Sequence, residues 1–300
     1  MIQDIGKHRF RNEYHPEAVP RADSKVLFYR GREIFVKCEE EQICFLTFEK
    51  VSEVWPEAGK KMIYLFSIDG VSYFLIAEFE MDTQKLDLQE ACKSKETENL
   101  LASFPGYSWV KIERMRTVGP KEAAFAGVTG LQLYEWYNSR RFCPACGKHM
   151  IHSEKERMMH CPACGQIEYP KICPAVIVAV TDGDRILLTK YAGRSFRNYA
   201  LIAGFAEIGE TLEETVEREV MEEVGLRVKN IRYYKSQPWS FTDTLLAGFF
   251  AEVDRDTHIH MDENELSVAK WCTREEVPED DGVSLTREMM GVFKSGRQPV

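Results

Sequence analysis

Three glutamates in the C-terminal half of the chain, Glu219, Glu222 and Glu223, have a spacing that suits a divalent cation. On an α-helix, residues at positions i, i+3 and i+4 lie on one face, so these three carboxylates would lie close together. Hard cations such as Mg²⁺ bind carboxylate oxygens together with the phosphate oxygens of a substrate. A solvated acidic face on a surface helix is the alternative interpretation of the same residues.

The residues around these glutamates predict the helix that would carry them. Thr211 and Glu214 form a T-x-x-E capping box, which places the helix start near Leu212, and Gly225 supplies a left-handed stop. Between these ends, residues recur at steps of three and four and predict a buried face. They are Leu212, Thr215, Val216, Val220 and Val224.

The segment from Gly204 to Leu226 fits the pattern G-x5-E-x7-R-E-U-x-E-E-x-G-U, where U is aliphatic, at every specified position. This pattern resembles the Nudix box, the signature of hydrolases that split a diphosphate linked to a nucleoside. The resemblance favours a metal site over a solvated face. It implies Mg²⁺ or Mn²⁺ as the catalytic cofactor.

The same resemblance implies a role for each charged residue of the box. Glu219 and Glu223 would bind the metal directly, and Glu222 would be a further ligand or the base that positions water. Arg218 would orient these carboxylates and pair with Glu210.

Three further positions resemble family contacts to metal or phosphate. Gly204 would let its loop approach the phosphates, the carbonyl of Ala203 would contact the metal, and Glu265 would complete the metal cluster. The implied metal ligands are therefore Ala203, Glu219, Glu222, Glu223 and Glu265.

Two C-x-x-C pairs in CPACG segments predict a structural zinc site. Their cysteines are Cys143, Cys146, Cys161 and Cys164. Four thiolates close a tetrahedral zinc site and leave no position for water. His152 and His160 lie between the pairs and remain alternative ligands, whereas a redox role fits two matched pairs less well. The other cysteines are expected to be small buried hydrophobic residues: Cys38, Cys44, Cys92, Cys173 and Cys272.

Composition sets broad limits on function. A chain of 300 residues has room for two or more domains, and 44% hydrophobic with 29% charged residues is typical of a soluble protein. The net charge of −9 argues against a general nucleic-acid coat but allows a local basic groove. We expect no membrane association and a cytoplasmic location, because the N-terminal residues are polar and the C-x-x-C cysteines favour metal over disulfides.

We expect an α+β chain with four segments. Residues 1–118 would form a β-rich domain with strands near 33–37, 61–68 and 71–79, the last two joined at Asp69-Gly70. Residues 119–139 would form a linker helix, and residues 140–170 the zinc ribbon. Residues 171–300 would form a Nudix α/β/α sandwich with a mixed sheet. Other expected elements are helices over 86–101, 120–139 and 285–293, and strands over 175–181, 185–189, 230–234 and 245–253.

The segment SQPWSFTDT, residues 236–244, resembles the SQPWPFPxS array of the NADH pyrophosphatase subgroup, which also carries a zinc ribbon before its Nudix domain. Ser240 and Thr242 replace prolines of the array, so we expect a less rigid loop, and Thr244 replaces its serine. The resemblance implies substrate contacts at Gln237, Pro238, Trp239, Ser240, Phe241, Thr242, Asp243 and Thr244.

Four residues outside this array also resemble substrate contacts. Phe205 and Tyr169 resemble aromatic residues that sandwich the adenine, with the tyrosine supplied by a partner subunit. Glu156, in the ribbon, and Thr286 resemble further contact positions.

The resemblance implies a homodimeric hydrolase that splits NAD(H) into NMN(H) and AMP. Removal of the NAD cap from RNA 5′ ends by the same chemistry is one alternative, and hydrolysis of another nucleoside diphosphate derivative is a second. A zinc-ribbon binding module with a silent Nudix fold is disfavoured, because the box lacks none of its glutamates.

Overall fold

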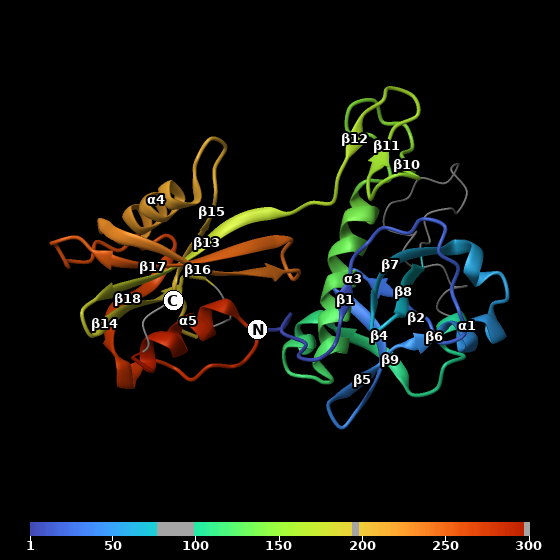
Figure 1. Cartoon of the computed structure of the whole chain (residues 1–300), viewed down its shortest axis with the longest axis horizontal. Coiled ribbons are helices and arrows are strands. Elements are labelled where there is room, and N and C mark those ends of the chain that lie inside the picture. Colours follow the sequence, from blue (N-terminus) through green and yellow to red (C-terminus); the bar gives the residue numbers. More distant parts are fainter. Residues whose placement is uncertain (77–98, 194–197, 297–300) are drawn as a thin grey trace. The chain divides into compact units, whose positions relative to one another are not determined.

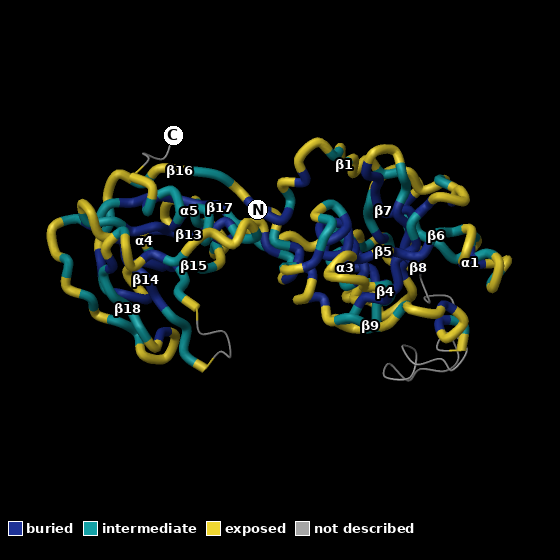
Figure 2. The backbone as a smooth tube through the Cα atoms, turned by 90° about the horizontal axis from the view of Figure 1, so that it is seen from below, coloured by how far each residue is buried: buried dark blue, intermediate teal, exposed yellow. Residues whose placement is uncertain are grey.

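The computed structural model describes residues 1–76, 99–193 and 198–296, and the chain divides into two compact units. One unit combines Met1–Gln3 with Ile172–Val300, and the other is Asp4–Lys171. Figure 1 labels their elements, and Figure 2 shows buried backbone in the interior of each unit with exposed residues at its rim.

The C-terminal unit is built on a six-stranded mixed sheet with the order β16-β17-β13-β14-β18, and β15 also pairs with β13. Only β13 and β17 pair in parallel among these strands, as the described residues show. The strands are β13 (Cys173–Asp182), β14 (Arg185–Tyr191), β15 (Ile202–Phe205), β16 (Val228–Trp239), β17 (Thr244–Val253) and β18 (Leu266–Thr273).

Two helices cover opposite faces of this sheet, α4 (Leu212–Val224) and α5 (Leu285–Lys294) (Figure 1). Successive side chains of a strand point to opposite faces, and β13 is apolar on both. Its Val176 packs in the core that contains Val220 of α4, while its Ile177 packs in the core that contains Met289 of α5. The expected α/β/α sandwich is confirmed.

Helix α4 begins and ends where the sequence predicts. The side chain of Thr211 accepts a hydrogen bond from the backbone N–H of Glu214 (3.2 Å), and the Glu214 carboxylate accepts one from the N–H of Thr211 (2.7 Å). Gly225 has a φ of 69°, the left-handed conformation that glycine adopts without strain. Thr215, Val216, Val220 and Val224 are buried as predicted. Leu212 is half-buried and packs at the edge of the core.

The N-terminal unit contains two small sheets with the orders β1-β7-β8-β2-β6 and β3-β4-β5, the latter with β9 on β4. Its elements are β1 (Phe10–Arg11), β2 (Lys25–Leu27), β3 (Tyr29–Arg30), β4 (Glu33–Glu39), β5 (Gln42–Cys44), β6 (Leu46–Thr47), α1 (Phe48–Val54), η1 (Ala58–Lys61), β7 (Met62–Ile68), β8 (Val71–Ile76), β9 (Tyr107–Lys111) and η4 (Ile112–Arg116). The turn at Asp69-Gly70 joins β7 to β8 with positive φ at both residues, as predicted. Most of the helix predicted over residues 86–101 lies outside the described residues.

The helix predicted after residue 119 is α3 (Lys121–Ser139), but it is not a linker. Ala124, Leu131, Tyr134 and Trp136 are buried as predicted, and so are residues on its other sides. A helix that is apolar nearly all round is a core element. The N-terminal sheets and the ribbon both pack on α3, so it belongs inside the unit.

The zinc-ribbon segment is a three-stranded antiparallel sheet of β10 (Ile151–His152), β11 (Met159–His160) and β12 (Ile167–Glu168). His152 stacks on Tyr137 of α3 with 4.9 Å between ring centroids, and Arg140 donates to Glu168 over 2.9 Å. These contacts join the ribbon to the end of α3.

The prediction that the remaining cysteines are buried is wrong for Cys38 and Cys44, which are exposed. They lie in the β4–β5 hairpin, where β5 is an edge strand and leaves side chains without cover. Cys272 is buried, Cys173 is half-buried and Cys92 lies outside the described residues. Among the described helices, none is long and apolar enough to cross a membrane.

Candidate metal and substrate site

Arg218 lies at the centre of the acidic site on α4. Its guanidinium donates to both carboxylate oxygens of Glu210, over 2.5 and 2.9 Å. One of its nitrogens donates to Glu219 (2.7 Å) and to Glu222 (2.9 Å), and another donates to the backbone carbonyl of Phe205 (2.9 Å). The predicted contacts of Arg218 with these carboxylates are therefore present.

The pKa values of two carboxyl groups beside Arg218 are shifted in opposite directions. The hydrogen bonds from Arg218, together with the N–H of Glu207, lower the pKa of Glu210 to about 2. Burial raises the pKa of Glu219, and the negative charges of Glu222 and Glu265 add to that rise although Arg218 opposes it. Glu219 is therefore a buried carboxylate under repulsion from other carboxylates, a situation that a bound cation would relieve.

Gly204 forms a cradle for Glu219. A Cβ atom built at Gly204 would lie 1.9 Å from the carboxyl carbon of Glu219, a distance that real contacts do not reach. Only glycine therefore allows strand β15 and this carboxylate to be in contact. A carboxylate oxygen is a ligand type that Mg²⁺ and Mn²⁺ accept, and Glu219 offers one at the end of β15.

The remaining predicted carboxylate ligands, Glu222, Glu223 and Glu265, differ in their exposure to solvent. The Glu223 side chain is buried, with 1% of the residue exposed, whereas 60% of the Glu222 side chain is exposed. The N–H of Asp262 donates to the carbonyl of Glu223, and this bond holds the segment that leads to Glu265 against the end of α4. Glu265 is itself exposed but close enough to raise the pKa of Glu219.

The carboxylates of α4 are not gathered around a common point. Among the described residues, the four cysteines of the ribbon are the group whose metal-ligating atoms lie close enough together to share one ion. Glu219 and Glu222 instead turn toward Arg218. A cation would have to take carboxylate oxygens from that arginine.

The four ribbon cysteines fit a zinc ion. Their sulfur atoms all lie within 4.8 Å of one another, with 3.5 Å between Cys143 and Cys164 and between Cys146 and Cys161. Tetrahedral ligands at the usual Zn–S length would be about 3.8 Å apart. The glycine after each pair has positive φ and donates its N–H to the backbone carbonyl of the first cysteine of the pair. Neither His152 nor His160 belongs to the cluster.

The predicted substrate array closes the β16–β17 hairpin. Residues 240–243 form the turn, and Trp239 pairs with Thr244 across the strands. The Trp239 ring packs against Phe241 with 4.8 Å between centroids, and the hydroxyls of Thr242 and Thr244 lie 2.9 Å apart. Phe241, Ser240 and Thr244 are buried, whereas Pro238 and Thr242 are exposed and Asp243 is half-buried.

Gln237 does not fit the expected substrate contact, because its side chain is completely buried and used within the unit. Its amide nitrogen donates to the side-chain oxygen of Gln3 (2.9 Å) and to the carbonyl of Val283 (3.0 Å). Its amide oxygen accepts from the N–H of Leu285 (2.7 Å). The sequence offers no sign of this role, since Gln3 lies at the other end of the chain.

The two aromatic residues expected to stack on adenine lie in different units. Phe205 ends β15 in the C-terminal unit and is 53% exposed. Tyr169 follows the ribbon in the N-terminal unit, is 51% exposed and donates its hydroxyl to Glu156 over 3.1 Å. Thr286, in the first turn of α5, is half-buried.

Thr215 is a site residue that the sequence reasoning placed only on the buried face. Its hydroxyl lies 3.0 Å from the Glu210 carboxylate and 3.0 Å from the carbonyl of Thr211. It therefore helps to hold Glu210 beside Arg218. The sequence does carry one indication of this role, because Thr215 is a polar residue on a helix face that is otherwise aliphatic.

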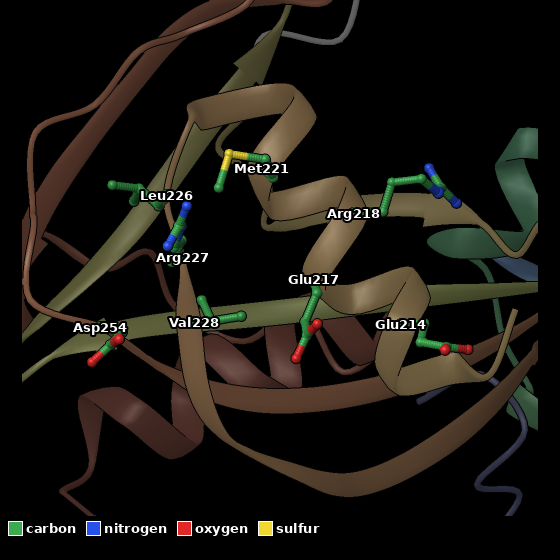
Figure 3. Close-up of a pocket in the computed structure, with 8 residues that line it drawn as sticks. All are labelled: Glu214, Glu217, Arg218, Met221, Leu226, Arg227, Val228 and Asp254. Carbon is green, nitrogen blue, oxygen red and sulfur yellow. The ribbon is translucent and has the colours of Figure 1, made fainter.

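A hollow of about 480 Å³ lies on another side of α4 (Figure 3). Its lining comes from α4, the start of β16 and the end of β17: Glu214, Glu217, Arg218, Met221, Leu226, Arg227, Val228 and Asp254. Figure 3 shows the Arg218 side chain leaving the helix in a different direction from Glu217. The hollow includes none of the predicted metal ligands.

Two family models match adjacent segments of the chain, and the boundary between them lies near residue 170. Residues 171–291 match the family model described as NUDIX domain, and residues 138–169 match the one described as NADH pyrophosphatase zinc ribbon domain. The match to the ribbon model comes first along the chain, and the match to the NUDIX model follows it directly.

Curated relatives match half of the chain. Proteins named "NAD-capped RNA hydrolase NudC" from Klebsiella pneumoniae and Citrobacter koseri are each 44% identical to it over 149 residues, which is 50% of this chain and 58% of the relative. The match therefore spans little more than half the length of those relatives. A solved NUDIX hydrolase from Nitrosomonas europaea is 25% identical, with a TM-score of 0.46, and covers 53% of this chain and 95% of its own.

Proposed function

We propose that this chain, in which a Nudix domain follows an NADH pyrophosphatase zinc ribbon, hydrolyses the diphosphate of NAD(H) to NMN(H) and AMP. The observation that carries the proposal is the Glu219 carboxylate held in the Gly204 cradle by Arg218. Glu219 is a buried acidic group, and Gly204 and Arg218, which hold it, are both residues of the Nudix pattern.

The catalytic cation would be Mg²⁺ or Mn²⁺, held by the Ala203 carbonyl and by Glu219, Glu222, Glu223 and Glu265. When bound, such an ion neutralises charge on the diphosphate and lowers the pKa of a bound water. Arg218 keeps Glu219 and Glu222 oriented from the side of Glu210. Because Arg218 and the cation draw on the same oxygens, we expect the arginine to give up part of these contacts when the ion binds.

Glu222 is the proposed general base. It is the most exposed of the three α4 carboxylates and can reach solvent, while Glu219 and Glu223 are buried. Arg218 orients the Glu222 carboxylate through a 2.9 Å hydrogen bond, and a carboxylate oxygen so placed can accept a proton from water. We expect water to attack the adenylyl phosphorus, so that ¹⁸O from labelled water would appear in AMP.

Substrate binding is assigned to Phe205, Thr286 and the hairpin residues 238–244 of the C-terminal unit, and to Tyr169 and Glu156 of the N-terminal unit. An exposed aromatic ring can stack on a base, and such stacking contributes about 1–3 kcal/mol. The proposal includes a homodimer in which the partner supplies the tyrosine, which light scattering of the purified chain would test. It also keeps the cytoplasm as the compartment, because zinc-binding thiolates need reducing conditions.

The test is a substrate panel with the purified full chain and either Mg²⁺ or Mn²⁺. NADH, NAD⁺, FAD, ADP-ribose and diadenosine polyphosphates would be compared, with products identified by mass spectrometry. The proposal predicts NMNH and AMP from NADH as the preferred reaction. If another dinucleotide is cleaved in preference, NAD(H) is the wrong substrate assignment. If none of them yields AMP, the result favours a binding module without hydrolase activity.

Removal of the NAD cap from RNA is the second candidate, and the name of the relatives favours it. The bond broken would be the same. The net charge of −9 makes extended RNA contact weak unless a local basic groove supplies it. A comparison of kcat/KM on NADH and on an NAD-capped oligonucleotide at two salt concentrations decides between the two substrates.

A further inference from the structure

The buried side chain of Gln237 joins three separate segments of the C-terminal unit. It projects from β16, just before the hairpin turn, and reaches Gln3, Val283 and Leu285. The Val283 carbonyl also accepts from the N–H of Ile2 (2.9 Å). One amide thus holds the hairpin, residues 1–3 and the start of α5 together.

The bond to Leu285 satisfies a group that the helix itself cannot satisfy. Leu285 is the first residue of α5, and the first N–H groups of a helix have no partner inside it. The Ser284 side chain caps the N–H of Arg287, and the amide oxygen of Gln237 caps that of Leu285. The start of α5 is therefore fixed relative to the hairpin.

We infer that Gln237 is a positioning residue that sets the hairpin residues 238–244 against the first turn of α5, where Thr286 lies. This inference rests on the proposed function, which assigns both segments to substrate binding. Gln237 acts through the groups that it holds and does not touch the substrate.

The chemistry of the three bonds requires an amide. Two N–H groups face the oxygens of Gln3 and Val283, and one oxygen faces the N–H of Leu285. Glutamate at this position would turn a carboxylate toward two acceptor oxygens. Methionine, of similar length, would leave the Leu285 N–H buried without its partner, which costs free energy.

The test uses the full chain with Gln237→Met and Gln237→Glu, assayed on NADH with Mn²⁺ well below the unfolding temperature of each variant. Loss of positioned binding contacts weakens substrate and transition state alike and so raises KM more than it lowers kcat. We expect at least a tenfold rise in KM with kcat within threefold for Gln237→Met, and a larger rise for Gln237→Glu. Gln3→Met, which removes one of the three bonds, should give a smaller rise.

The matched control is Val180→Ala, a buried change in β13 about 16 Å along the strand from the register position of Gln237, at 3.3 Å per residue. It lowers stability without touching the hairpin, so its KM should stay within twofold of the unchanged chain. If Val180→Ala raises KM as much as Gln237→Met, or if Gln237→Met leaves KM within twofold, the inference is wrong.

Hydrogen exchange separates this inference from the proposed function. In Gln237→Met, the amides of Leu285 and of Thr242, which donates to Trp239, should exchange at least tenfold faster than in the unchanged chain. Unchanged exchange at both amides would contradict the positioning role whether or not NADH is a substrate. A chain that releases no AMP from NADH would overturn the proposed function alone.

Discussion

Arg218 shows how few residues determine the geometry of the acidic site. Its guanidinium donates to Glu210, Glu219, Glu222 and the carbonyl of Phe205, and so links the loop after β15 to two turns of α4. Charge-assisted and bidentate bonds of this kind are among the stronger polar contacts in proteins. These bonds orient the Glu219 carboxylate, and the missing side chain of Gly204 leaves the space that the carboxylate occupies.

Replacement of Gly204 by alanine should disturb the metal site directly. The new Cβ would occupy the place of the Glu219 carboxyl group, so this carboxylate must leave its position. We expect kcat/KM on the preferred dinucleotide to fall at least hundredfold and the Mn²⁺ concentration for half-maximal activity to rise. Gly291→Ala on α5 is the control, because its Cβ would meet only Asp280, at an ordinary 3.6 Å, and activity within twofold is expected.

The low pKa of Glu210 predicts a pH-dependent contribution to stability. Its pKa is about 2 in the folded chain, against an ordinary value of 4.5. A carboxyl whose folded pKa is depressed stabilises the fold fully above the ordinary value, and that contribution is lost as pH falls toward the folded value. Glu210→Gln should therefore lower the unfolding temperature at pH 7, and the gap to the unchanged chain should shrink between pH 5 and pH 2. A gap that is constant over this range would show that the ionised carboxylate does not stabilise α4.

At the scale of elements, the ribbon depends on its metal more than on its own core. Its three strands are two residues each, His152 stacks on Tyr137 of α3, and Arg140, at the end of α3, donates to Glu168 of β12. Removal of zinc by a chelator should release one equivalent per chain and increase exchange across residues 143–168. Cys161→Ser should have the same effect, whereas Cys272→Ser lies outside the cluster and should keep its zinc, as measured by atomic absorption. Full zinc content in Cys161→Ser would contradict the four-cysteine site.

Elements specified by local sequence were predictable. The Thr211 capping box and Gly225 define both ends of α4, and Asp69-Gly70 defines a hairpin, because each signal lies within a few residues of the feature it produces. Contacts between distant residues were not predictable. The burial of α3 on nearly all sides and the bonds of Gln237 to Gln3 and Leu285 depend on segments far apart in the chain.

Among the predicted site residues, contacts within one motif were also predictable, whereas contacts between distant segments were not. Arg218 contacts Glu210, Glu219 and Glu222 because all four lie on α4 or in the loop before it, within the span of one motif. The spacing of the glutamates indicated a shared helix face but not that Arg218 would hold two of them. The proposed metal site also includes Glu265 and relies on Gly204, and both residues lie outside α4.

At the scale of the whole molecule, the residues assigned to substrate are distributed over both units. The unit of Asp4–Lys171 carries Glu156 and Tyr169 on its ribbon, and the unit with Ile172–Val300 carries Phe205, the hairpin and the acidic helix. The zinc ribbon thus contributes an exposed tyrosine held by a glutamate, in addition to its contacts with α3.

The most direct measurement of the central claim is product release from NADH with Mn²⁺ by the unchanged chain and by Glu223→Gln, with Glu217→Gln on the same helix as control. Glu223 is buried and assigned to the metal, whereas Glu217 lines the separate hollow. We predict NMNH and AMP from the unchanged chain and from Glu217→Gln, and turnover lower by orders of magnitude in Glu223→Gln, with fold and zinc content intact. Near-normal AMP release by Glu223→Gln would contradict a metal site on this helix face.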